Sequence, residues 1–242
     1  VPRAACFVAP RVSSWDGYRR ASRADLDWTT LTVRDQAAIF VPNDTAPQEI
    51  RDCLHEEMAQ ALGPLNDLYR LPDSVFNDDN IHTVLTGFDM LMLRATYAPE
   101  LHSGMTPEAV ALSLPGVLAR LNPRGAHGTA PPPDLTPRSY IAAIETALGP
   151  GTSPARRRSA AEEAVRIALA RGWNDGRTGF AWLALGRLSL GHDAQTARTA
   201  FSEAAALYDR SPVLALQGAN ADMQLAAFAL SDGDADTVLA LT

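Results

Sequence analysis

The second half of the chain repeats a pattern of small and large apolar residues at helical spacing. The pattern is Ala161-x-x-x-Val165-x-x-Ala168, and it recurs 36 residues later as Ala197-x-x-x-Phe201-x-x-Ala204, with a weaker echo at Ala235-x-x-x-Leu239. Spacings of three and four residues place these side chains on one face of a helix. Small residues let paired helices approach closely, and larger ones fill the seam between them. The pattern predicts antiparallel helices that stack into a small curved array.

Between the two copies lies Trp182-x-x-Leu185-Gly186, and Pro212 follows the second copy. This arrangement resembles a tetratricopeptide repeat whose spacings differ by one or two residues. The resemblance covers about residues 140–242, and a generic array of helical hairpins is the alternative. The expected repeat core is Trp182, Leu185, Gly186, Ala197, Phe201 and Ala204. Repeats of this kind usually bind peptides or proteins, so the resemblance implies a protein partner.

A Pro- and Gly-rich stretch separates this region from the first half. Residues 122–133 contain four prolines and two glycines, a composition that marks a domain boundary. We therefore expect a first domain at residues 1–122, a linker at 123–137 and helical repeats at 138–242.

The most informative segment of the first half is a helix that ends at Gly63. A capping box of Thr45 and Gln48, with Pro47 in the first turn, predicts its start. One side carries an apolar stripe that we expect to face the core, namely Ile50, Leu54, Met58 and Leu62. Another side carries Cys53, Glu56, Glu57 and Gln60. Gly63 lets the chain turn back after the helix.

This segment resembles the metzincin zinc-peptidase motif H-E-x-x-H-x-x-G-x-x-H. Glu57 and Gly63 stand at the catalytic Glu and the turning Gly, while Glu56, Gln60 and Asn66 stand at the three His positions. Neutral amides are weak ligands for zinc. The resemblance therefore implies a vestigial site with no metal, no cofactor and no peptidase activity. An ordinary amphipathic helix is the alternative interpretation.

Two segments downstream extend the resemblance. Phe76 stands where metzincins have the Met of a tight turn, and Leu85-Thr86-x-x-Asp89 opens a helix that ends near Tyr97. More closely, residues 37–122 resemble a bacterial family of domain-of-unknown-function proteins, which brings no established activity. The shared segments are Cys53 to Gly63, Asn66-Asp67 and Phe76 to Asp79. The acidic stretch 73–79 lacks the EF-hand pattern and is expected to form turns and helix caps.

The remaining elements of the first half follow from local patterns. Residues 37–41 form a short apolar run that predicts a strand, and residues 105–121 predict a helix. The first 36 residues fit a helix followed by a strand. His55, His82 and His102 are scattered and expected at the surface. The predicted fold class is α+β and predominantly α: a degenerate metzincin-like (zincin) domain followed by an all-α, tetratricopeptide-like domain.

Composition restricts the class of partner. The net charge is −7, and all 21 basic residues are Arg. An acidic chain of this kind is not expected to bind nucleic acid. The one basic run, Arg156 to Arg158, is expected to be a solvated helix start. No run of 18 apolar residues exists, so direct membrane insertion is not expected.

Cys6 and Cys53 are the two cysteines. A disulfide between them would tie the N-terminal segment to the 47–62 helix, and two buried free thiols are the alternative. Disulfides persist in oxidising compartments. We therefore expect a protein exported to the bacterial periplasm or beyond, with its signal segment removed.

These observations predict a pseudoenzyme: a non-catalytic binding or scaffold protein that docks a protein partner through its helical repeats. One alternative is a structural subunit of a cell-envelope assembly. Another is a metallo-hydrolase in which Glu57 is the base and a cation binds among Glu56, Gln60, Asn66 and Asp67.

Overall fold

The computed structural model describes residues 6–44, 46–66, 68–77, 81, 83–125, 134–149 and 151–242. They form two units. The N-terminal unit draws on residues 1–67, 74–76 and 82–133, and the helical unit on residues 68–73, 77–81 and 134–242. Helices dominate the described residues, and the sheet among them has two strands. The predicted class, α+β with a large excess of helix, is confirmed.

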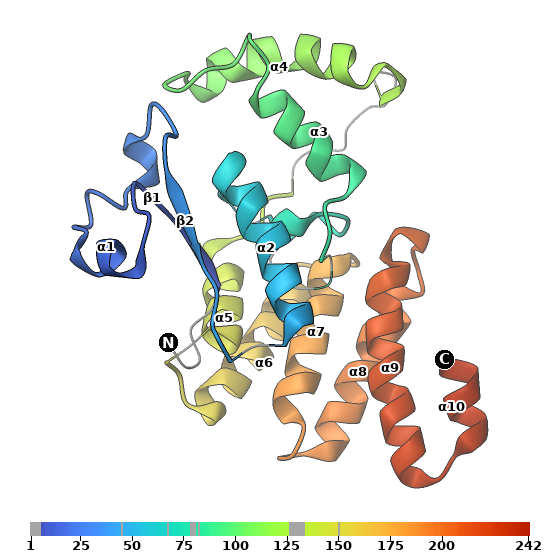
Figure 1. Cartoon of the computed structure of the whole chain (residues 1–242). Helices are drawn as coiled ribbons and strands as arrows, with labels where there is room; N and C mark the ends of the chain where they lie inside the picture. Colours follow the sequence, from blue (N-terminus) through green and yellow to red (C-terminus); the bar gives the residue numbers. More distant parts are fainter. Residues whose placement is uncertain are drawn as a thin grey trace. The chain divides into compact units, whose positions relative to one another are not determined.

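The N-terminal unit begins with strand β1 (Phe7–Pro10), helix α1 (Trp15–Arg20) and the 3₁₀ helix η1 (Trp28–Thr30). Strand β1 pairs antiparallel with β2 (Ala37–Phe40), with Phe7 opposite Phe40 (Figure 1). The strand predicted at 37–41 is present. The expected order of the first 36 residues is wrong, because the strand precedes the helix. Aromatic side chains join these elements: the ring of Phe7 lies 5.0 Å from those of both Tyr18 and Phe40.

The N-cap of helix α2 (Pro47–Leu62) lies one residue after the predicted N-cap, Thr45. The backbone N–H of Ala46 donates to the Glu49 carboxylate at 2.9 Å, so Ala46 is the N-cap residue. Thr45, half of the predicted capping box, lies outside the described residues. The helix ends at Leu62, and Gly63 follows as the predicted C-cap.

The apolar stripe of α2 does not form the core, contrary to expectation. Leu54, Met58 and Leu62 are exposed, and Ile50 is half-buried. The opposite side of the helix is the buried one, because the disulfide at Cys53 holds that side toward β1.

Two further helices complete this unit. Helix α3 (Gly87–Thr96) opens within the predicted segment 85–89, with Thr86 as its N-cap, and α4 (Pro107–Leu121) opens after Thr106, two residues later than expected. Ala95, Ala98 and Val117 form a small core between them. The 3₁₀ helix η3 (Pro123–Gly125) follows, and most of the predicted linker, residues 126–133, lies outside the described residues.

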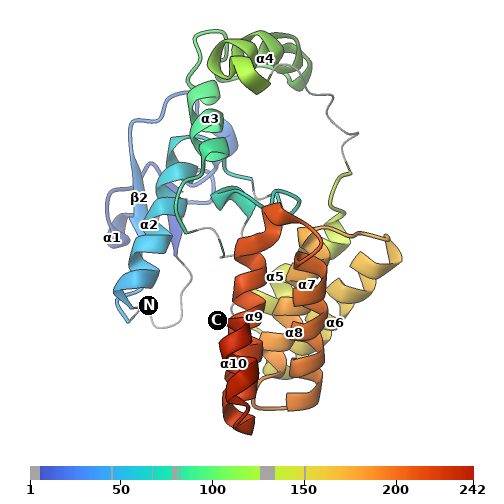
Figure 2. The ribbon, with the colours of Figure 1, turned by 90° about the vertical axis from the view of Figure 1, so that its right-hand side faces the viewer.

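The described residues of the helical unit form three hairpins in sequence order. They are α5 (Arg138–Leu148) with α6 (Pro154–Ala170), α7 (Gly176–Ser189) with α8 (Ala194–Tyr208), and α9 (Ala215–Asp232) with α10 (Ala235–Leu241), with the 3₁₀ helix η4 (Pro212–Leu214) before α9. Each helix packs against its neighbours in the chain, which gives a row of adjacent helices (Figure 2).

Two glycines determine how closely α7 and α8 approach. A Cβ on Gly186 would lie 2.6 Å from the Phe201 ring, and a Cβ on Gly179 would overlap the Tyr208 ring. The two glycines are seven residues apart on α7, and the two aromatic residues are seven residues apart on α8. The pairs run in opposite directions along the two helices, as antiparallel helices require. Phe201 and Tyr208 are among the largest fully buried side chains. The aromatic rings therefore occupy the space that the missing side chains leave.

A segment far away in sequence completes the helical unit. Tyr69 and Ile81 are part of its buried core, and the Tyr69 ring meets that of Tyr140 edge-on at 6.1 Å. The Gln217 side-chain amide donates to the Pro72 carbonyl. Residues 68–73 and 77–81 were expected in the first domain, whereas they group with residues 134–242, so the helical unit is built from three separate stretches of chain.

Arg177 connects the start of α7 to the residues that precede α5. Its buried guanidinium pairs at 2.6 Å with both Asp134 and Asp175 and lies 3.6 Å from the centre of the Trp173 ring. The hydrogen bond from Arg177 holds the pKa of the Asp134 carboxyl below its ordinary value. A buried arginine with two carboxylates and an aromatic ring is well compensated for its loss of water.

Candidate functional site

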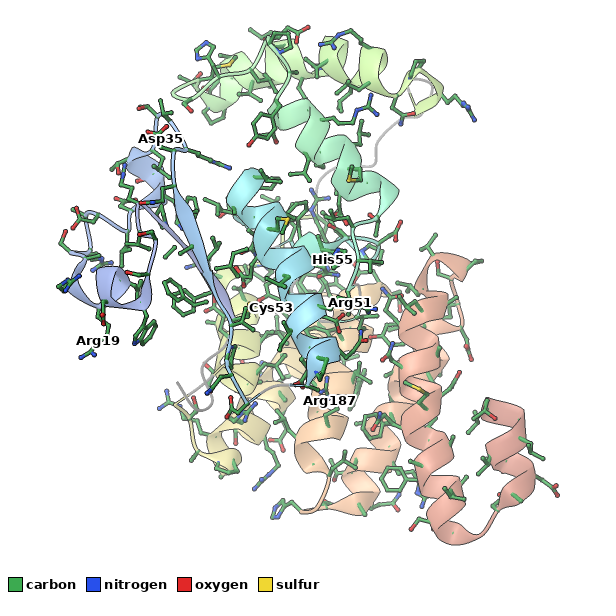
Figure 3. The ribbon with its side chains drawn as sticks, viewed as in Figure 1. Arg19, Asp35, Arg51, Cys53, His55 and Arg187 are labelled. Carbon is green, nitrogen blue, oxygen red and sulfur yellow. A yellow bond between two sulfur atoms is a disulfide. The ribbon has the colours of Figure 1, made fainter. Side chains whose placement is uncertain are left out.

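The disulfide between Cys6 and Cys53 fixes the orientation of α2. The predicted disulfide is present, with its Cα atoms 6.0 Å apart. Cys53 lies on the side of α2 that faces the strands, whereas Arg51 and His55 lie on the other side (Figure 3). Glu56, Glu57 and Gln60 are three, four and seven residues from Cys53 and share its face. The motif positions on this helix therefore face the interior of the N-terminal unit.

The motif residues occupy different environments. Glu57 is buried, with 6% of its surface exposed, while Glu56 and Gln60 are half-buried. Asn66 is exposed in the loop after α2. Asp67, which the alternative cation site would use, lies outside the described residues. The catalytic Glu of a zincin cleft would be open to water and substrate, whereas Glu57 is buried.

The turn after α2 is held by a buried carboxylate. Asp89 is fully buried and accepts hydrogen bonds from the Ser74 hydroxyl (2.6 Å), the Val75 amide (3.1 Å) and the Thr86 amide (2.8 Å). The Thr86 hydroxyl accepts in return from the Asp89 amide, which completes a capping box. The carboxylate thus joins the N-terminus of α3 to the Ser74–Phe76 turn.

Phe76 is the residue that the sequence comparison aligned with the metzincin Met. It lies in the 3₁₀ helix η2 (Val75–Asn77) and is buried with Val75 against Ala59 of α2. Asp78 and Asp79, which belong to the family hallmark, lie outside the described residues. The turn therefore supports the same helix that carries Glu57 and Gln60.

The end of α2 is held by a charge and by close packing. The Arg34 guanidinium donates to the carbonyls of Ala61 (3.1 Å) and Gly63 (3.0 Å), where cations complement the helix dipole. A Cβ on Gly63 would lie 3.2 Å from the Thr96 side chain, so close approach to α3 favours glycine here. The sequence did not reveal Arg34, because it is 27 residues from the helix end that it caps.

Metal-binding side chains do not gather in the part of the chain that the structure describes: no three His, Cys, Asp or Glu residues form a ligand set there. His55 is half-buried and His102 is exposed, while His82 lies outside this part. No helix of the described residues has the length and apolarity needed to cross a bilayer.

The predicted repeat-core residues all lie in one place. Ala197, Phe201 and Ala204 are fully buried on α8, Leu185 and Gly186 are buried on α7, and Trp182 packs against the same core. The basic run at the start of α6 has an additional role, because Arg157 donates to the Ala147 and Leu148 carbonyls at the end of α5. The core therefore unites the hairpins, and Arg157 caps the helix before its own.

The comparisons with known proteins concern the N-terminal half. No curated protein and no solved structure matches the chain. Residues 1–116 match the family described as "Protein of unknown function (DUF2927)", which agrees with the expected resemblance to a domain-of-unknown-function family.

Proposed function

We propose that this protein is a non-catalytic binding or scaffold protein that docks a protein partner through its helical hairpins. The observation that carries the proposal is the row of three antiparallel hairpins, α5–α6, α7–α8 and α9–α10, packed in sequence order. Stacked helical hairpins create extended surfaces that repeat proteins use for binding. The likeness to tetratricopeptide repeats supports the same conclusion by analogy of fold.

The N-terminal unit is proposed to be a pseudo-peptidase with a zincin-like ancestry. The order of its segments supports this idea: α2 ends at a closely packed Gly63, the Phe76 turn lies against α2, and α3 opens at Thr86. The burial of Glu57 supports loss of catalysis, because a general base must reach water and substrate.

Hydrolysis and binding are tested separately. We expect the purified full chain to contain no stoichiometric zinc and to cleave no peptide in a chelator-sensitive manner. Cleavage that Glu57→Gln abolishes would contradict the pseudo-peptidase proposal.

Binding is tested on a partner complex isolated from the native cell envelope. Because the chain has no lysine, cross-linkers that react with Asp and Glu are needed. We expect cross-links to the partner to concentrate on residues 134–242. Cross-links confined to residues 6–125 would contradict docking through the hairpins.

Export to an oxidising compartment is the proposal for localisation. The Cys6–Cys53 disulfide supports it, because disulfides persist outside the reducing cytoplasm. Alkylation of the native protein without reductant should leave both cysteines unmodified, and modification of both would contradict the proposal.

A further inference from the structure

A short segment from the first half of the chain lies on the hairpins. Residues 68–73, which we call the inserted segment, belong to the helical unit and contain no helix or strand. Tyr69 is 5% exposed, and its ring meets that of Tyr140 on α5 edge-on at 6.1 Å. Tyr140 in turn meets the Trp173 ring edge-on at 5.4 Å. Tyr69 therefore adds to the aromatic core of the hairpins a side chain that the hairpins themselves do not supply.

Pro72 brings the inserted segment to the other two hairpins. A Cβ on Gly176, at the start of α7, would lie 3.6 Å from the Cβ of Pro72. The Pro72 carbonyl accepts a hydrogen bond from the side-chain amide of Gln217, a buried residue on α9. The inserted segment thus contacts α5, α7 and α9, which are the first helices of the three hairpins. A peptide bound across a stacked array contacts successive repeats in the same way.

The inserted segment also has the burial pattern of a bound peptide. Tyr69 is its one buried residue, whereas Leu71 and Pro72 are half-buried and the other three are exposed. In bound segments a few buried anchors, aromatic ones above all, carry most of the binding energy. The hydrogen bond from Gln217 is made to a main-chain carbonyl, which a peptide from another protein also offers. Neither contact requires that the segment belong to the same chain.

We propose that the inserted segment is an internal ligand that occupies a peptide-binding site formed by α5, α7 and α9. The site takes a partner segment in which a tyrosine is followed three positions later by a proline, the spacing of Tyr69 and Pro72. This inference rests on the proposed function and names the site and the kind of partner.

The internal ligand controls access to this site. A tethered ligand has an effective concentration on the order of millimolar, so it competes strongly with a free peptide. The apparent affinity for a partner is reduced by the fraction of molecules in which the site is empty. The first half of the chain therefore inhibits partner binding by the second half until the partner displaces the inserted segment.

The first test uses the full chain and a fluorescent synthetic peptide with the sequence of residues 66–75. Tyr69→Ala removes the internal anchor, and this variant should bind the peptide at least roughly tenfold more tightly than the wild-type chain, measured by fluorescence anisotropy. Leu68→Ala, at an exposed neighbour, is the matched control and should bind like the wild type. Tyr69→Leu, which keeps part of the buried apolar area, is the second variant and should change the affinity in the same direction.

Altered peptides identify the group that the site recognises. Alanine at the peptide position of Tyr69 should weaken binding to the Tyr69→Ala chain roughly tenfold or more, since the aromatic anchor is lost. Alanine at the peptide position of Leu68 should leave the affinity unchanged.

A second test does not depend on how well the alanine variant folds. The chain is prepared with fluorotyrosine at its five tyrosines, and Tyr69→Phe identifies the Tyr69 signal in the fluorine NMR spectrum. Excess unlabelled peptide should move this signal toward that of Tyr97, which is 62% exposed, because the displaced Tyr69 ring enters water.

Four results would overturn the inference. They are equal affinity of the wild-type and Tyr69→Ala chains, no peptide binding by a folded Tyr69 variant, binding that does not depend on the tyrosine of the peptide, and a Tyr69 signal that excess peptide does not move. The proposed function fails by different results, namely chelator-sensitive hydrolysis or partner cross-links outside the helical unit.

Discussion

At the scale of single residues, Gly186 and Phe201 set the distance between α7 and α8. The Gly186→Ala change would place a methyl group against the Phe201 ring. Overpacking of this kind costs about 1–3 kcal/mol of unfolding free energy. Urea denaturation measures it, with Gly116→Ala as the matched control, because nothing lies within 4 Å of that Cβ position in α4. The control should be neutral or stabilising by up to about 1 kcal/mol. Equal effects at the two glycines would contradict this account.

Asp222 provides a pH-dependent prediction at the same scale. Burial and Asp209 raise the pKa of its carboxyl in the folded state. The protonated form therefore favours folding, and this contribution is present below the unfolded-state pKa and lost as pH rises through the folded one. Asp222→Asn should raise the unfolding free energy at pH 7 and lose that advantage in acid. Glu203→Gln on α8 is the control. A gain of the same size at acid pH would refute the explanation.

Several residue roles could be predicted from local sequence. Thr86 and Asp89 stand three residues apart before an apolar helix, which is a pattern with a local cause, and the structure has this capping box. The pairing of Cys6 with Cys53 left only one alternative. Arg34 and Arg157 could not be assigned in this way, because each caps a helix to which it does not belong. Their roles depend on distances in space that a periodicity does not encode.

At the scale of elements, the disulfide determines which side of α2 is buried. Cys6 and Cys53 are 47 residues apart in sequence. Reduction should cost roughly 2–5 kcal/mol of unfolding free energy, largely because the unfolded chain regains freedom. Chemical denaturation with and without reductant measures the loss. The double variant Cys6→Ser, Cys53→Ser should be insensitive to reductant, and equal sensitivity in that variant would mean that another group responds.

Helix α2 also shows the limit of periodicity at this scale. Its stripe of Leu54, Met58 and Leu62 is regular, and it predicts an amphipathic helix. The structure contains that helix but buries the side with Cys53 and Glu57. Periodicity identifies an apolar side, whereas a covalent bond decides which side turns inward. The helical character of residues 138–242 was easier to predict. Most helices there pack against the helix before and the helix after them, and their apolar periodicity reflects that packing.

At the scale of the whole molecule, the stability of the helical unit depends on a segment around Tyr69 that comes from the first half of the sequence. Tyr69 is buried against Tyr140, whereas the adjacent Leu68 is exposed. Tyr69→Ala should lower stability by about 3–5 kcal/mol, as for other large aromatic residues in cores. Leu68→Ala should have little effect.

Hydrogen exchange locates that loss. Amides of α5 and α7 should exchange faster in Tyr69→Ala, while those of α3 should retain their protection. Faster exchange in α3 alone would contradict the assignment of this segment to the helical unit. No sequence pattern indicated this assignment, because Tyr69 and Tyr140 belong to regions that composition separates at the Pro-rich stretch.

The chain enters the helical unit twice before residue 82, and this has a consequence for how such a protein can be inherited. Residues 68–73 and 77–81 belong to the helical unit, and residues 74–76 between them belong to the other. A recombination event at the Pro-rich stretch would transfer the hairpins without Tyr69 and Ile81, and would leave a hole in their core. The two halves are therefore expected to be inherited together as one gene segment, in contrast to domains that recombine independently.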